Sequence, residues 1–232
     1  MCQKTKAPMK LKIYLLLLIV ITAYNYQLCG QTISAKAGLN SSSLKGEPIP
    51  EVWGLEKEIK KSGIGPHAGI FLEIPVKENF SLQAGLIVSH KGESIELIFK
   101  DTTIQKRLYN KSSLYYLELP VTGKYSVRLY KNTTIYALAG LYFGYGIIGR
   151  TEYSYDLYGK DYAGYYDTWE RHGSNIFKRT DAGAIAGIGF QMGSIGLEYN
   201  YYMGLKDVYN NDSGSTFQVM KLSLTYRIGK LK

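Results

Sequence analysis

The sequence predicts an all-β fold: a closed antiparallel up-and-down transmembrane β-barrel of about eight strands, preceded by a signal peptide. Three observations predict it. The chain begins with a cationic and apolar segment, the remainder alternates between apolar and polar residues, and short and long connections alternate between the predicted strands. Tyr (22) and Gly (25) are abundant and Pro (6) is scarce, which favours pleated strands and tight turns.

The first segment, residues 1–30, is predicted to be a secretory signal peptide. Lys10 and Lys12 precede an apolar run, residues 13–23, that is too short to be a stable spanning helix. We expect cleavage between Gly30 and Gln31. Residues 31–232 then form a single barrel domain, because one barrel can absorb about 200 residues without a second core.

Cysteine usage and charge limit the classes of function. Cys2 and Cys29 are the only cysteines, so the processed chain would hold no disulfide and no cysteine-based metal site or nucleophile. An alternative makes Cys29 the lipid-bearing residue of a lipoprotein, although residues 26–28 before it are not the small residues that such processing needs. Residues 1–30 carry four lysines and no acid, so 28 minus 4 basic residues against 19 acidic ones leaves a net charge of +5. The remaining cations are scattered, and no nucleic-acid partner is expected.

Each strand is predicted from alternation of period two. In the last strand, Leu222 and Leu224 alternate with Lys221, Ser223 and Thr225, so one face is apolar and the other polar. The eight predicted strands are residues 32–39, 65–74, 80–91, 115–127, 134–147, 180–191, 195–204 and 219–228.

The connections orient the predicted barrel. The short ones are residues 75–79, 129–132 and 192–194, and the long ones are residues 40–62, 92–112, 149–179 and 205–214. Long exterior loops and short periplasmic turns are typical of barrels in the bacterial outer membrane. Because hydrocarbon cannot satisfy a free strand edge, the first strand must pair with the last.

The polar face of each strand is expected to point into the lumen and to hold an ionic network. An eight-stranded barrel is just wide enough to be filled by side chains, so these charges are expected to pair rather than to line an open pore. An alternative is a path for protons or for a substrate. The inward set has three acids and four bases: Lys36, Glu73, Glu118, Lys124, Glu198, Lys221 and Arg227.

No catalytic or metal site is predicted. His67, His90 and His172 fit no metal-binding spacing. Ser89 and His90 are neighbours in a predicted strand, so their side chains would point to opposite faces and could not form a nucleophile–base pair. We therefore expect no enzyme activity, no metal and no cofactor.

The long connection over residues 149–179 is the candidate binding region. It is rich in tyrosine among Gly, Asp and Lys, and Tyr and Trp offer large rigid contacts with a polar group. An equally weighted alternative is that the flanking strands extend above the membrane with aromatic cross-strand pairs. The candidate binding residues are Tyr158, Tyr162, Tyr165, Tyr166 and Trp169.

Several pieces in this order resemble a known group. They are KAGLN (36–40), GIFLEIP (69–75), FSLQ (80–83), YLELPV (116–121), AGLYFGY (139–145), GIGF (187–190) and LSLTYRI (222–228). Together they resemble the PorT-like outer membrane β-barrel proteins, common in Bacteroidetes, over nearly the whole processed chain. The resemblance implies a barrel in contact with outer membrane lipid, and one group of members is similar to proteins that serve the secretion of surface proteases.

Two functional hypotheses follow. The first is a non-enzymatic protein of the bacterial cell envelope, either structural or binding an envelope or extracellular protein through its exterior loops, or an accessory part of a secretion system. The alternative is small-molecule binding or transport through the barrel lumen.

Overall fold

The computed structural model describes residues 30–46, 55–100, 107–169, 177–209 and 214–230. The predicted signal peptide therefore lies outside the described residues, except for Gly30. In chain order the strands are β1 (Thr32–Lys45), β2 (Leu55–Lys77), β3 (Phe80–Phe99), β4 (Arg107–Tyr130), β5 (Thr133–Leu157), β6 (Lys160–Asp167), β7 (Thr180–Met192), β8 (Ile195–Gly204) and β9 (Thr216–Lys230).

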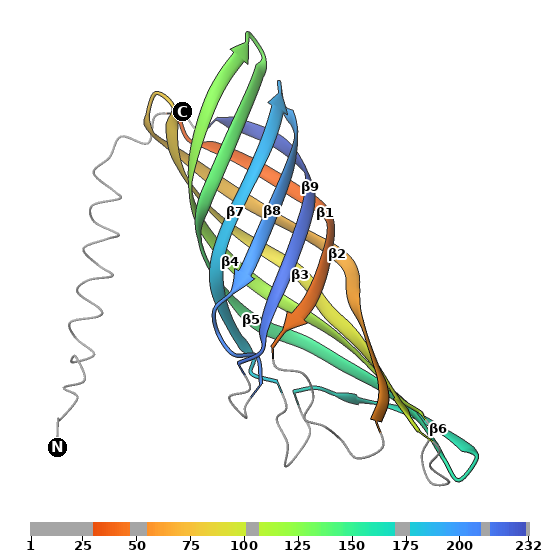
Figure 1. Ribbon diagram of the computed structural model, residues 1–232. Coiled ribbons are helices and arrows are strands. Elements are labelled where there is room, and N and C mark those ends of the chain that lie inside the picture. The colour runs from red at the N-terminus through yellow and green to blue at the C-terminus, as the bar shows by residue number, and fades with distance from the viewer. Residues whose placement is uncertain (1–29, 47–54, 101–106, 170–176, 210–213, 231–232) are drawn as a thin grey trace, which may run out of the picture.

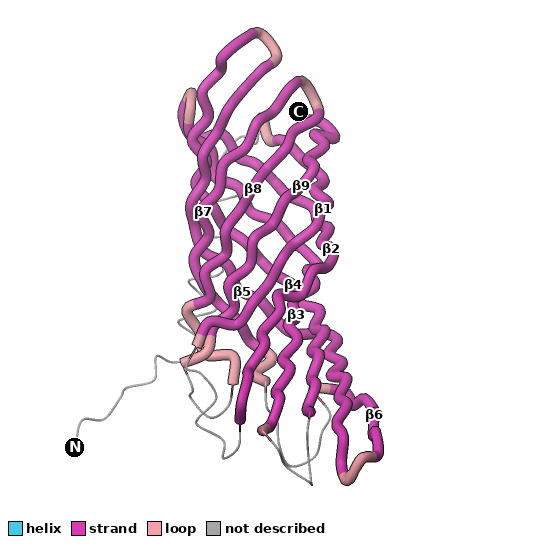
Figure 2. Tube along the Cα trace, turned by 45° about the vertical axis from the view of Figure 1, so that its right-hand side comes forward, coloured by secondary structure: helices cyan, strands magenta, loops and turns pink. Residues whose placement is uncertain are grey.

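Eight of these strands close into a ring, which confirms the predicted antiparallel barrel (Figure 1). Each of the eight pairs with its neighbours along the chain, β5 passing directly to β7. The ring is closed by β1 and β9, which are antiparallel from Thr32↔Lys230 to Lys45↔Thr216. The one remaining strand among the described residues, β6, pairs only with β5 and lies outside the ring (Figure 2).

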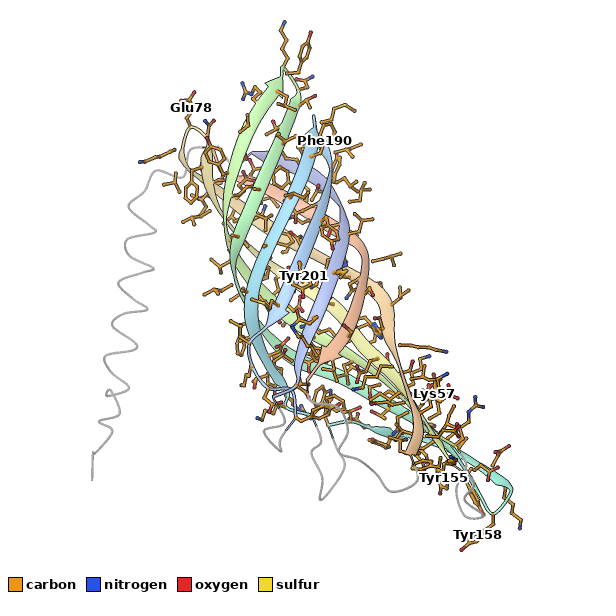
Figure 3. All side chains as sticks on the ribbon, in the orientation of Figure 1. Lys57, Glu78, Tyr155, Tyr158, Phe190 and Tyr201 are labelled. Carbon is orange, nitrogen blue, oxygen red and sulfur yellow. The ribbon has the colours of Figure 1, made fainter. Side chains whose placement is uncertain are left out.

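The two faces of the wall differ as the alternation predicts. On β9, Leu222 and Leu224 point outward and are 51% and 60% exposed, whereas Lys221, Ser223 and Thr225 are buried in the lumen. The same division holds around the ring, and large apolar side chains cover its outside (Figure 3). A continuous apolar surface of this kind is stable in lipid and not in water.

Connections of different length lie at opposite ends of the barrel. Three two-residue turns, Glu78–Asn79, Lys131–Asn132 and Gly193–Ser194, join strands at what we call the turn end. The start of β1 and the end of β9 lie at the same end. The remaining connections lie at the loop end, where the two-residue turn Tyr158–Gly159 joins β6 to β5. Between strands of the ring, the predicted alternation of short and long connections is confirmed.

At the loop end the strands continue far beyond the ring, and here the predicted loop boundaries are wrong. Much of residues 40–62, 92–112 and 149–179 belongs to β1, β2, β3, β4, β5 and β6. A strand that stands in water needs no continuous apolar face, so charged and polar residues interrupt the alternation here, and these segments resembled loops. The result is a sheet in the order β2-β3-β4-β5-β6 that projects from one side of the barrel (Figures 1 and 2).

Among the described residues, none forms a helix of the length and apolar character that crossing a membrane requires.

Candidate functional site

The lumen holds three layers of paired charge, of which the layer nearest the loop end is the most deeply buried. Lys91 Nζ lies 2.5 Å from Asp181 Oδ2 and 2.9 Å from Glu118 Oε1, and Lys221 donates to the other oxygen of Glu118. All four side chains are at most 1% exposed. The two cations balance the two carboxylates, so the layer is neutral, as burial in a low-dielectric interior requires.

Aromatic rings enclose this first layer. Lys91 Nζ lies 4.9 Å from the ring centres of Tyr116 and Tyr142, and the Tyr142 hydroxyl donates to Asp181 at 3.0 Å. Lys221 Nζ lies 4.0 Å from the ring centre of Tyr202. Cation–π contacts and charge-assisted hydrogen bonds thus replace the water that these ions have lost.

The second layer centres on Glu198. Its two carboxylate oxygens accept from Lys36 Nζ at 2.6 and 2.7 Å, and further bonds come from Tyr136 (2.8 Å) and Asn200 (2.7 Å). Lys36 also donates to Gln83 at 2.9 Å. Lys36 on β1 and Glu198 on β8 are 162 residues apart in the chain, and only the closure through β9 brings them together.

The third layer lies at the turn end. Lys124 Nζ donates to Glu73 Oε2 at 2.8 Å, and Ser81 donates to the other oxygen at 2.9 Å. Arg227, expected in the same network, is half-buried at the mouth of the lumen and forms no ion pair with another described residue. The structure thus places six of the seven predicted interior charges in ion pairs, whereas Arg227 acts on Glu73 only through its charge.

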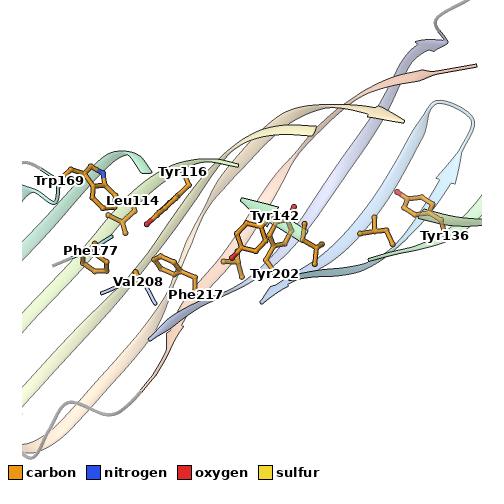
Figure 4. Close-up of a cluster of buried hydrophobic side chains, with 12 residues drawn as sticks. Leu114, Tyr116, Tyr136, Tyr142, Trp169, Phe177, Tyr202, Val208 and Phe217 are labelled. Atoms are coloured by element: carbon orange, nitrogen blue, oxygen red, sulfur yellow. The ribbon is translucent and has the colours of Figure 1, made fainter. Parts of the chain in front are cut away.

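An apolar plug closes the lumen at the loop end (Figure 4). Tyr116 packs edge-on against Trp169 and Phe217, with ring centres 6.1 and 5.9 Å apart, and Phe177 packs against Tyr209 at 4.9 Å. Burial raises the pKa of Tyr209, which lies beyond the end of β8. We call this apolar cluster the outer plug, and it comprises Leu114, Tyr116, Trp169, Phe177, Val208, Phe217 and Val219.

Little free space remains between the plug and the second layer. The cavity bounded by Lys36, His67, Glu198 and Lys221 measures about 10 Å³, which is room for a single water molecule at most. His67 fills much of this level, with Nε2 2.8 Å from Ser223 Oγ. Between the plug and the second layer, the lumen of the described part of the chain is therefore filled by side chains.

Sequence reasoning missed two members of the first layer and the whole plug. Lys91 and Asp181 lie at the ends of predicted strands. Both occupy positions of the alternation that point into the lumen, and this alternation could have identified them. Trp169, Phe177 and Val208 come from connections, where no alternation indicates that a side chain folds back into the barrel.

Residues 149–167 of the candidate binding region form a two-stranded projection of β5 and β6. Tyr155 lies directly opposite Tyr162, and their rings stack with centres 5.4 Å apart. Tyr153 stacks on Tyr155 at 6.2 Å and contacts Tyr166 at 6.1 Å. Gly164 lies opposite Tyr153, and a Cβ there would lie 2.6 Å from the Tyr153 hydroxyl oxygen. The absence of a side chain at Gly164 therefore leaves room for the Tyr153 ring. We call these four tyrosines the tyrosine ladder, and they match the alternative of aromatic cross-strand pairs.

The five predicted binding residues do not form one surface. Tyr162 and Tyr166 belong to the ladder. Tyr165 lies on the opposite face of β6, beneath Arg150, and is 67% exposed. Tyr158 lies at the tip of the hairpin, is 69% exposed and has a φ of +50° (Figure 3). Trp169 is only 8% exposed, so its prediction as a surface contact is wrong. Gly146 and Gly149 leave space for its indole, since a Cβ on either would lie 2.5 Å from the ring.

The serine and histidine side chains form no charge-relay arrangement. Ser89 accepts from Asn40 inside the lumen at 3.1 Å, whereas His90 Nε2 lies 2.7 Å from Ser113 Oγ. His90 Nδ1 has no hydrogen-bond partner among the described residues, so no carboxylate orients the imidazole there. Within the same ranges, no three His, Cys, Asp or Glu side chains are grouped to hold a metal ion.

Comparisons with known proteins agree with this architecture. A family model described as "Outer membrane protein beta-barrel domain" matches residues 30–210. No curated protein matches the chain in sequence.

Similar solved structures share little sequence with the chain. OprG from Pseudomonas aeruginosa is 10% identical, with 86% of this chain and 96% of that chain covered and a TM-score of 0.45. Ail of Yersinia pestis is 12% identical (86% and 99% covered, TM-score 0.40), and Neisserial surface protein A is 13% identical (84% and 95% covered, TM-score 0.40). Because the family model spans most of its length, the chain belongs to the outer membrane protein β-barrel domain family.

Proposed function

We propose that the protein is a non-enzymatic outer membrane barrel that binds a protein partner outside the cell through the sheet projecting from its loop end. The observation that carries this proposal is the tyrosine ladder on the β5–β6 hairpin. Four tyrosines on one face, held in place by stacking, lose little side-chain entropy when a partner packs on them. The processed chain is exported by the signal peptide, with the loop end outside and the turn end in the periplasm.

The filled lumen argues against the transport alternative. A solute would have to displace the outer plug and then break the ion pairs of Lys91 and Lys36, whose partners lie within 3 Å. Removing one partner of a buried pair costs several kcal/mol. The barrel is thus better suited to hold the projecting sheet rigidly than to conduct.

The resemblance to PorT-like barrels suggests the kind of partner. An accessory role in secretion would require the projecting sheet to meet another protein of the envelope. Its exposed face is large, aromatic and hydroxyl-bearing, as recognition surfaces commonly are. One of the similar solved structures holds Ail in complex with the heparin analogue sucrose octasulfate. A sulfated carbohydrate is a competitor to include when partner binding is measured.

The test is photo-crosslinking in intact cells. A benzophenone amino acid replaces Tyr162 in the ladder, Tyr165 on the opposite face of β6, or Leu222 on the lipid face as the control. We expect a discrete protein adduct from position 162, lost when Tyr155 and Tyr153 are changed to Ser, and no protein adduct from position 222. The absence of a protein adduct from both hairpin positions would refute the proposal.

A further inference from the structure

The mouth of the lumen at the turn end contains a pocket separate from the projecting sheet. Its volume is about 360 Å³, within the lower range of small-molecule sites. Side chains at the ends of β2, β3, β4, β5, β7 and β9 form its wall. The turn after β2, where Glu78 lies, forms its rim (Figure 3). We call this the mouth pocket.

The charges that line the mouth pocket are unbalanced. Glu73 is already matched by Lys124 at 2.8 Å. Three further cations line the pocket, Lys77, Arg128 and Arg227, against one further acid, Glu78. None of these three cations forms an ion pair with another residue of the described ranges. The pocket therefore carries a net charge of +2, in contrast to the neutral layer around Lys91.

The alternation of side chains along β4 places the guanidinium group of Arg128, which forms no ion pair with the rest of the described chain, in the pocket. Thr122, Lys124 and Ser126 share the inward face of β4, and Arg128 continues the same alternation two residues beyond Ser126. β4 pairs with β3 only as far as Tyr125↔Phe80, so Arg128 stands on a hairpin that rises above the rim. Arg227 occupies the corresponding inward position near the end of β9, and hydroxyl groups of Ser126 and Thr134 lie on the same wall.

The floor of the mouth pocket is closed. The Glu73–Lys124 pair and Tyr136 form it, and the Tyr136 hydroxyl is bonded to Glu198 of the second layer. A molecule that enters from the turn end thus meets a wall rather than a passage. This arrangement is a binding pocket with one opening.

We propose that the mouth pocket binds a small soluble oxyanion, a molecule bearing phosphate or several carboxylates. The planar guanidinium groups of Arg128 and Arg227 match the oxygens of either group with paired hydrogen bonds. At about 30 Å³ per water, the pocket volume corresponds to roughly a dozen waters, so the pocket can admit a molecule such as pyrophosphate or a tricarboxylate. This site lies at the opposite end of the barrel from the tyrosine ladder and does not depend on the proposed function.

Calorimetric titration of the folded barrel in zwitterionic detergent, at low ionic strength, tests the proposal. Inorganic pyrophosphate and citrate are the two probes. We expect one equivalent of either probe to bind, and Arg128→Gln or Arg227→Gln to weaken binding by about tenfold each, since each removes charge-assisted hydrogen bonds. Lys111→Gln, which removes a cation at the loop end, is the matched control and should leave the affinity unchanged.

A second arm separates a soluble anion from a lipid headgroup with the same chemistry. The titration is repeated in nanodiscs of phosphatidylcholine with or without phosphatidylglycerol. Unchanged pyrophosphate affinity supports a soluble ligand. Competition by phosphatidylglycerol that vanishes in Arg128→Gln would overturn the proposal, because it would assign the pocket to a lipid headgroup. No saturable binding, or equal weakening by all three substitutions, would overturn the proposal, because diffuse screening rather than a built pocket would explain the result.

Discussion

The apolar outer face of β9 permits a quantitative test of the barrel's depth in lipid. Leu222→Arg places a charge on the lipid side, where Leu222 is 51% exposed between Leu39 on β1 and Tyr199 on β8. Ile228→Arg is the matched control, because Ile228 has the same outward parity and is 59% exposed. Both changes replace an aliphatic side chain by the same cation and differ chiefly in depth.

The strand geometry sets the expected magnitudes. Leu222 is near the middle of β9, which runs from Thr216 to Lys230. Six residues further on, at about 3.4 Å per residue and a tilt of about 45°, Ile228 lies about 14 Å further along the membrane normal. An apolar band about 25 Å tall then places Leu222 near the midplane and Ile228 at the edge, with costs of about 2–4 and about 0–1 kcal/mol for Arg.

The assay is reversible urea unfolding in phosphatidylcholine vesicles, with each variant compared to the wild type. The free energy of unfolding should fall by at least about 1 kcal/mol more for Leu222→Arg than for Ile228→Arg. Equal losses for the two variants, or no loss for Leu222→Arg, would show that this face of β9 does not lie in hydrocarbon.

Three further predictions concern the interior. Glu118→Gln leaves Lys221 without its carboxylate and should cost about 3–5 kcal/mol, part of which Lys221→Gln in the same chain should restore by returning the layer to neutrality. Glu152, in contrast, is about half exposed, and Glu152→Gln should change the free energy of unfolding by no more than about 0.5 kcal/mol. A double-mutant cycle in which the effects of the Glu118 and Lys221 substitutions are additive would contradict their pairing. Trp169→Ala should cost about 3–5 kcal/mol because it opens a cavity in the outer plug, whereas Tyr165→Ala should stay within about 0.5 kcal/mol in the same urea titration. In planar bilayers the protein should carry no steady current, and a sustained open-channel conductance would be inconsistent with the filled lumen.

The barrel itself was predictable because lipid imposes a strict rule on every strand. A residue such as Leu222 must face hydrocarbon, and its neighbours Lys221 and Ser223 must then face the lumen, so period two identifies both strands and faces. Closure also followed from physics, since an unpaired edge of β1 could not be satisfied in hydrocarbon.

The pairing inside the lumen was less predictable than the inward faces. Alternation places Lys36 and Glu198 inside, but their contact depends on the relative shift of β1, β9 and β8 around the ring. No local pattern in the sequence fixes that shift. The same limit explains why Arg227 was expected in the network and instead lies at the mouth.

The loop end was the least predictable part. Beyond the membrane both faces of a strand meet water, so the alternation that indicated β9 is absent from the first half of β2 and from β6. Whether an aromatic side chain in this region is buried or exposed depends on contacts with residues distant in the sequence. Trp169 turns inward because Gly146, Gly149 and Tyr116 provide a place for the indole, while Tyr165 four residues earlier remains exposed.

The most direct test of the account is the gel mobility of the membrane-extracted protein in dodecyl sulfate, without and with boiling. A ring of eight strands whose first and last members are hydrogen-bonded resists the detergent at room temperature and unfolds on heating, so we predict two distinct mobilities for the same chain. A single mobility under both conditions would contradict the closed barrel.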